Sequence, residues 1–222
     1  FGIPLQFDKC YTEGISRIEP QDVAYAEEFG YRIKHLGFTR RAGKGIELRV
    51  HPTLIPERRL IANVDGVMNA VLVQGDAVGP TLYYGAGAGS LPTASAVVAD
   101  IIDVTRTLTI DPENRVPHLA FQPGELSDMP VLSMDDVVTA YYLRMTVEDR
   151  PGVLAAVSGI LAEHGISIEA MQQKEPAEGE NQVPLVMLTQ SVRESQMNAA
   201  LGGVEALDSV AGEVTRIRLE KL

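Results

Sequence analysis

Cysteine and tryptophan are almost absent from the sequence. One cysteine, Cys10, stands among 222 residues, and there is no tryptophan. A single cysteine excludes an intrachain disulfide framework and favours a reducing, cytoplasmic compartment. Aromatic residues make up 5% of the chain and hydrophobic residues 45%. We therefore expect a core of Leu, Ile, Val, Ala and Met, in one large or two modest domains.

Positive charge and long apolar runs are scarce as well. The formal net charge is -11, which argues against nucleic acid or an anionic membrane as a partner, because both need a cationic surface. No apolar run approaches the roughly 20 residues of a membrane span, and no signal peptide is visible. The chain begins with Phe1 rather than Met, which indicates a processed product or a piece of a longer protein.

A run of alternating glycines is the most distinctive pattern that is present. Gly85, Gly87 and Gly89 follow a short apolar run and precede a small-residue helix expected over Thr93–Val104. Such a turn can bring backbone N–H groups close to a phosphate or pyrophosphate. The spacing G-x-G-x-G differs from the G-x-G-x-x-G fingerprint. The pattern alone leaves two interpretations open, a phosphate-binding turn and a tight strand-to-helix turn with close packing.

The residues before this turn predict an α+β unit with antiparallel strands. Apolar residues at helical spacing predict a helix over Pro20–Leu36, which Gly37 would end. A hairpin follows over Phe38–Val50, and the alternation of Glu47–Val50 is typical of a strand with one half-buried face. The prolines at both ends of Pro52–Pro56 are expected to break regular structure.

Two further strands, Met68–Val73 and Thr81–Tyr84, lead into the glycine turn. Residues 1–104 contain no Ser-His-Asp or Cys-His arrangement and no metal ligands at suitable spacing. We therefore predict no catalytic residue and no metal site. Residues 105–139 are rich in proline and are predicted to form a linker, with one added strand near His118–Phe121.

Residues 140–222 predict a self-contained unit with the element order βαββαβ, the ferredoxin-like arrangement. Its second helix is expected to begin at a capping Ser191, with Glu194 three residues on. The expected elements are strands over Tyr141–Val147, Ile166–Gln173, Val183–Thr189 and Val214–Leu219, and helices over Val153–His164 and Ser191–Leu207.

Two motifs in this unit carry a resemblance. Asp149–Leu154, with the sequence DRPGVL, is followed by the GISI of Gly165–Ile168. Together they resemble the ACT domain, a regulatory module that binds amino acids and usually pairs side by side in a homo-oligomer. Pro-Gly can open a helix whose free N–H groups receive a ligand carboxylate, or can simply make the turn. The effector-binding residues that the resemblance implies are Asp149, Pro151, Gly152 and Val153.

Five blocks in the first half carry a second resemblance. They are Tyr11–Ile15, Arg32–Gly37, Val50–Pro56, Ala62–Val71 and Tyr84–Val98. In this order they resemble the C-terminal part of the catalytic domain of homoserine dehydrogenase, which an ACT domain follows in bacteria. The fold implied is α+β, a partial catalytic domain with a mixed or antiparallel sheet over residues 1–104, then the linker and the ACT domain.

This second resemblance implies an enzyme that interconverts L-homoserine and L-aspartate 4-semialdehyde with NADP or NAD, in threonine and methionine biosynthesis. Gly85, Gly87 and Gly89 would then contact the cofactor, and threonine would be the allosteric effector. The family's dinucleotide-binding domain and catalytic lysine precede the part resembled here. Neither Lys9 nor Lys34 lies in that lysine's context, so the 222 residues alone are expected to be inactive.

An alternative of a different class stays open. The ACT unit could serve a non-enzymatic amino-acid sensor or a dimerisation protein, and amino-acid binding would separate the sensor from the dimerisation module. The glycine turn is expected to form one wall of a site whose other wall lies outside this chain. The helix Thr93–Val104 should then present an uncovered apolar face, or find a partner in another subunit.

Overall fold

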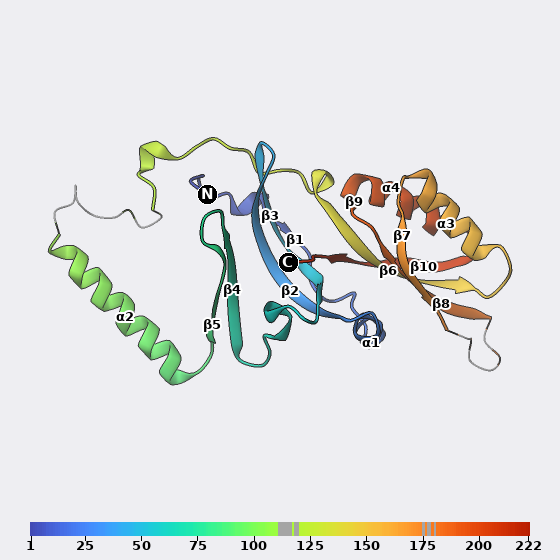
Figure 1. The fold of residues 1–222 in the computed structure, drawn as a ribbon, viewed down its shortest axis with the longest axis horizontal. Helices are drawn as coiled ribbons and strands as arrows, with labels where there is room; N and C mark the ends of the chain where they lie inside the picture. Colours follow the sequence, from blue (N-terminus) through green and yellow to red (C-terminus); the bar gives the residue numbers. More distant parts are fainter. Residues whose placement is uncertain (111–116, 118–119, 175, 177–178, 180) are drawn as a thin grey trace. The chain divides into compact units, whose positions relative to one another are not determined.

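The computed structural model describes residues 1–222 except 111–116, 118–119, 175, 177–178 and 180 (Figure 1). The chain forms two compact units, and both are discontinuous in sequence. The larger unit joins Leu5–Arg58 to Met129–Leu222, and the smaller joins Phe1–Pro4 to Arg59–Asp128. The larger unit therefore combines the first strands of the chain with the whole C-terminal region.

An eight-stranded sheet organises the larger unit, with the order β1-β3-β10-β6-β8-β7. Strand β2 pairs with β3 outside this path, and β9 pairs with β6. β10 runs parallel to β3, with Arg218 opposite Thr53, so the C-terminal strands continue the sheet begun near the N-terminus. The strands are β1 (Tyr11–Thr12), β2 (Tyr31–Ala42), β3 (Gly45–Pro56), β6 (Val138–Glu148), β7 (Ile168–Gln173), β8 (Gln182–Thr189), β9 (Val192–Arg193) and β10 (Val210–Leu219).

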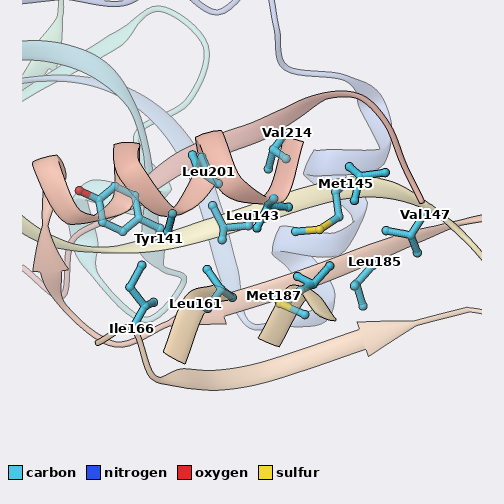
Figure 2. Close-up of a cluster of buried hydrophobic side chains, with 14 of the residues drawn as sticks. Tyr141, Leu143, Met145, Val147, Leu161, Ile166, Leu185, Met187, Leu201 and Val214 are labelled. Carbon is cyan, nitrogen blue, oxygen red and sulfur yellow. The ribbon is translucent and has the colours of Figure 1, made fainter. Parts of the chain in front are cut away.

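The C-terminal part of this sheet confirms the ferredoxin-like prediction. Its order β10-β6-β8-β7 places the four strands of the βαββαβ motif in the order fourth, first, third, second. The helices α3 (Val153–Glu163) and α4 (Glu194–Glu205) contribute buried residues to the same core as alternate residues of β6. Figure 2 shows these side chains between strands and helices; they include Leu143, Met145, Leu161, Met187 and Leu201.

The helix predicted over Pro20–Leu36 is wrong in its second half. Helix α1 spans only Pro20–Glu28, and Gly30 follows with φ 78°. The rest belongs to β2, which pairs with β3 from Tyr31 opposite Pro56 to Ala42 opposite Gly45. This long antiparallel ladder outweighs the helical spacing of a few apolar residues, because local propensity is a weak signal beside tertiary pairing.

Two predicted element ends are also wrong. Pro52 and Pro56 do not break regular structure, since β3 runs through to Pro56; a strand accepts proline wherever its ladder needs no N–H donor. Ser191 does not cap α4, because Val192–Arg193 forms β9 and the helix begins at Glu194. The Glu194 side chain instead contacts Arg218 and Tyr141.

The smaller unit holds the glycine turn. Strands β4 (Met68–Gly75) and β5 (Gly79–Ala86) pair as an antiparallel hairpin, and α2 (Ser90–Leu108) follows. Both predicted strands and the predicted helix are therefore confirmed, with longer bounds. Part of the strand predicted near His118–Phe121 lies outside the described residues.

Short 3-10 helices complete the described elements. Two lie in the larger unit and two in the smaller. Within the larger unit, residues 130–132 of the predicted linker also pair with β3, because Ile46 donates its N–H to Pro130 O at 2.9 Å and Leu132 donates its N–H to Ile46 O at 2.8 Å. The 3-10 helices are Phe7–Lys9, Leu60–Asn63, Pro123–Glu125 and Met134–Asp136.

Candidate functional site

The three predicted glycines lie on one short path from β5 into α2. Gly85 is within β5 and pairs with Asn69, and Gly87 donates its N–H to Val67 O at 3.1 Å. A Cβ on Gly87 would clash with the Asn69 amide, whereas a Cβ on Gly85 would meet no described atom within 4 Å. Gly89 has φ 127° and ψ 148°, a conformation that is essentially restricted to glycine.

This backbone leaves the start of α2 without a side-chain cap. Gly89 is the N-cap residue and has no side chain, and its carbonyl accepts from Thr93 N at 3.1 Å. The first N–H groups of a helix need partners from outside the helix, and they favour negative charge. The geometry therefore agrees with both open interpretations, because it combines close packing at Gly87 with an accessible helix start.

The four predicted effector residues also lie together, in the loop that follows β6 and at the first residue of α3. Asp149 donates its N–H to Asn181 O at 2.9 Å, and its carboxylate accepts from Gln173 Nε2 at 3.4 Å. Gly152 has φ 95° and is the N-cap residue of α3. Val153 is only 4% exposed, so its side chain packs in the core and only its backbone can face a ligand.

Sequence reasoning missed a group of buried ion pairs in the larger unit. The first centres on Arg218 of β10, which is 1% exposed. It donates to Glu194 Oε2 at 2.9 Å and to Glu13 Oε2 at 2.8 Å, and Tyr11 OH lies 3.1 Å from its Nη2. Burial raises the pKa of the Glu13 carboxyl, but hydrogen bonds from Arg218 and Tyr11 outweigh this and hold the pKa below its usual value.

A second ion pair joins α1 to β6. Asp22 is fully buried and accepts from Arg144 Nε at 2.6 Å and from Tyr142 OH at 2.8 Å. Burial and the neighbouring Asp22 carboxylate raise the pKa of Tyr142. Because charges removed from water need complete hydrogen bonding, this pair fixes the position of α1 on the sheet.

A third cluster covers β3. The buried Arg49 donates to Glu47 Oε2 at 3.1 Å and also pairs with Glu220. Its Nη1 lies 2.6 Å from His51 Nε2, so the ring nitrogen must accept and Nδ1 donates to Pro52 O at 2.9 Å. Burial lowers the pKa of His51 to about 4, which keeps the ring neutral near pH 7.

These clusters correct the interpretation of Glu47–Val50 as half-buried. Its polar face is not in water, since Glu47 is 5% and Arg49 1% exposed. The sequence did contain a signal for these buried charges, because charged residues alternate along β3 and again at Arg216 and Arg218 of β10. Charges of opposite sign on neighbouring strands can satisfy one another inside the protein, but strand order is needed to see which strands are neighbours.

The described residues of the larger unit enclose at least two cavities. One, of about 300 Å³, is lined by Cys10, Tyr11 and Arg49 among others. The other, of about 500 Å³, lies between the segment Tyr11–Ile18, helix α4 and strand β10. No group of three or more His, Cys, Asp or Glu side chains in the described part of the chain could hold a metal ion. No helix there is long and apolar enough to cross a membrane.

The comparisons with known proteins agree with both resemblances. Residues 1–102 match the family model described as homoserine dehydrogenase, and residues 141–205 match the ACT domain. The chain is 62% identical over 222 residues to homoserine dehydrogenase of Pseudomonas aeruginosa, covering 100% of this chain and 51% of the relative. It is 55% identical over 222 residues to that of Neisseria gonorrhoeae, with the same coverage of 100% and 51%.

A solved structure supports the same assignment. The crystal structure of a homoserine dehydrogenase from Thiobacillus denitrificans is 66% identical in sequence and superposes with a TM-score of 0.91. The match covers 100% of this chain and 50% of that chain. The sequence thus spans about half the length of the relatives it matches, as its resemblance to the second half of such an enzyme predicts.

Proposed function

The chain belongs to the homoserine dehydrogenase family, and on that basis we propose that it forms part of an enzyme that interconverts L-homoserine and L-aspartate 4-semialdehyde, in threonine and methionine synthesis. The observation that carries the proposal is the family match over residues 1–102, which contains the whole glycine turn. A cytoplasmic location, expected from the single Cys10, stays a prediction.

The glycine turn is proposed to lie against NADP or NAD. That cofactor supplies the hydride chemistry, while the protein holds and orients it. The residues fit such a group, because Gly87 and Gly89 keep the backbone close to its neighbours and the start of α2 carries N–H groups that favour negative charge. Gly85 adds open space beside them.

The apolar surface of α2 supports a further part of this proposal. Leu91, Ile101 and Leu108 are 81%, 59% and 69% exposed, more apolar surface than a helix in a finished protein leaves in water. We assign this surface to the rest of the longer protein or to a second subunit of a homo-oligomer. The catalytic groups are assigned to the other half of the enzyme.

Measuring dehydrogenase turnover tests whether the catalytic groups lie in the other half of the enzyme. We expect the 222-residue chain to show no oxidation of NADPH with aspartate semialdehyde, and the full-length protein to show it. In the full-length protein, Gly89→Val should raise the KM for the cofactor at least tenfold, because a β-branched residue cannot adopt this backbone without strain. Activity of the short chain alone would refute the assignment of catalysis to the missing half.

The ACT domain is proposed to regulate the enzyme by binding an amino acid, with threonine as the first candidate. The loop that holds Asp149, Pro151, Gly152 and Val153 opens α3, and its N–H groups can receive a carboxylate. Calorimetric titration of threonine, isoleucine and methionine tests this. Heat of binding without turnover in the full-length protein would instead favour the non-enzymatic sensor, and no binding would leave a dimerisation module.

A further inference from the structure

The cavity of about 500 Å³ in the larger unit lies where two parts of the sequence meet. One wall is the segment Tyr11–Ile18, from the homoserine dehydrogenase match. The other wall is made by α4 and β10, which belong to the ferredoxin-like part. A ligand here would touch both parts at once, and it would lie away from the loop that opens α3.

Part of the lining of this cavity is apolar, and we call this part its floor. Leu201 and Ile217 are 8% and 2% exposed, and Ile18 is half-buried beside them. A small aliphatic side chain placed against these residues would leave water for an apolar surface. Small-molecule sites commonly combine such a floor with a few polar groups that orient the ligand.

The rim carries charges of both signs. Arg17 and Arg216 are cationic, and Glu13 and Glu205 are anionic. Arg17 pairs with Glu213 at 3.3 Å, but both side chains are about three-quarters exposed, at 77% and 76%, and such an exposed pair contributes little and exchanges partners readily. The other three groups have partners within the protein, because Arg216 pairs with Glu194 at 3.2 Å, Glu205 accepts from Val214 N at 2.9 Å and Glu13 accepts from Arg218 at 2.8 Å. The rim therefore offers an exposed cation, Arg17, and the hydrogen-bonding capacity that these contacts leave on the other three groups.

Helix α4 leaves room above this floor. A Cβ built on Gly202 would meet no described atom within 4 Å, so this face of the helix opens into the cavity. On the next residue, Gly203, a Cβ would lie 3.1 Å from the Ile160 side chain, so that position is already packed. Gly202 is therefore a position at which the cavity can be filled without disturbing the core.

We propose that this cavity binds a small α-amino acid with an aliphatic side chain. Its carboxylate faces Arg17 and Arg216, its ammonium group faces Glu13 and Glu205, and its side chain lies on the apolar floor. The proposal rests on regulation by an amino acid, as proposed above, and gives that regulation a second location.

The position of the cavity couples binding of the amino acid to contacts elsewhere in the larger unit. Glu13 on its rim is held by Arg218, which also binds Glu194 at the start of α4. A ligand that prefers the assembled junction stabilises it by mass action, and the effect is reciprocal. The amino acid would thus strengthen the attachment of the ferredoxin-like part to the N-terminal segment.

Filling the cavity tests the proposal on the full-length protein. We expect Gly202→Phe to weaken binding of L-threonine, L-valine or L-isoleucine by at least about tenfold in calorimetry, because the ring occupies the space of the ligand. The matched control is Gly159→Phe, another exposed helical glycine with no described atom within 4 Å of a Cβ, on α3 and outside the cavity; it should bind like the unmodified protein. Circular dichroism checks that both variants fold.

Two further comparisons keep the outcomes distinct. Asp149→Ala changes the α3 loop and not the cavity, so Gly202→Phe should still weaken binding in the Asp149→Ala background; loss with Asp149→Ala and no loss with Gly202→Phe would overturn this proposal and leave regulation through the α3 loop intact. For L-valine, removal of either charge, in 3-methylbutanoate or isobutylamine, should weaken binding at least about tenfold, because a charged rim group loses its partner. Equal binding of all three, or no binding of any aliphatic amino acid, would also overturn it.

Discussion

Helices α2 and α4 differ sharply in burial. Five residues of α4 are buried, Glu194, Met197, Ala200, Leu201 and Val204. None of the residues of α2, all of which the structure describes, is buried. Apolar residues are present in both, so the difference lies in the partner surfaces and not in the helices. The larger unit contains the sheet that its helices need, and the smaller unit does not.

The burial of charged residues also distinguishes the larger unit. In the larger unit Arg49, Arg144 and Arg218 are 1%, 8% and 1% exposed, and each has a carboxylate partner. Such groups are tolerated only when the surrounding structure is complete. The larger unit therefore buries its charges and the apolar faces of its helices, whereas the smaller unit leaves the apolar residues of α2 in water.

The strongest test of this comparison breaks the Arg218 cluster. Arg218→Ala should lower the free energy of unfolding by about 3–5 kcal/mol, because Glu194 and Glu13 then lose a buried partner. Urea denaturation of the 222-residue chain measures it. Arg17→Ala is the control, since its pair with Glu213 is largely in water, and it should change stability little. A loss as small as that of the control would show that the cluster is not needed.

The second test compares apolar residues of the two units. Leu161→Ala, in the core of the larger unit, should cost about 2–5 kcal/mol through lost burial and a cavity. Ile101→Ala, on α2, should cost far less, because Ile101 is 59% exposed while Leu161 is 0% exposed. Equal losses in urea denaturation would mean that the smaller unit buries α2 in solution.

The third test uses pH on the larger unit. The folded pKa of His51, about 4, lies below its ordinary value of 6.5, so between these values the unfolded chain binds more protons. Stability should therefore fall by about 1–3 kcal/mol as the pH drops from 6.5 towards 4. His51→Gln keeps one acceptor and one donor and should flatten the slope in this window. If the slope of stability against pH stays the same in His51→Gln, groups other than His51 cause the pH dependence.

The last test concerns a local effect in the glycine turn. Gly89→Ala should destabilise this turn by about 1–3 kcal/mol, because its φ of 127° strains any side chain. Gly85→Ala should have little effect, since a Cβ there meets no described atom within 4 Å. Hydrogen exchange of the amides in β5 and at the start of α2 measures both. Equal protection in the two variants would contradict the strain at Gly89.

Much of the fold was predictable where local pattern and tertiary structure agree. The hairpin β4–β5, helix α2 and the βαββαβ order were all recognisable, because their periodicity, turn glycines and apolar faces point to one structure. The site residues were recognisable as motifs, and the structure brings each set together in one turn. Their contact with a cofactor or an effector remains proposed.

The failures share one physical cause. Residues 32–36 fit a helical stripe locally, yet they form β2 because β3 offers a twelve-residue ladder, with Tyr31 opposite Pro56 at one end. In the same way, nothing local indicated that Arg218 would meet Glu13, which lies 205 residues away in sequence. Such choices depend on which surfaces become neighbours after folding.

Short motifs and periodicities were enough to indicate the resemblance to homoserine dehydrogenase, the ACT domain, the α+β class and the glycine turn. Three features became visible only in the folded chain: β10 joins β3, the charges of Arg49 and Arg218 are buried, and a cavity opens between Tyr11–Ile18 and α4. The reason is that burial and pairing are properties of two surfaces, and one stretch of sequence describes only one of them.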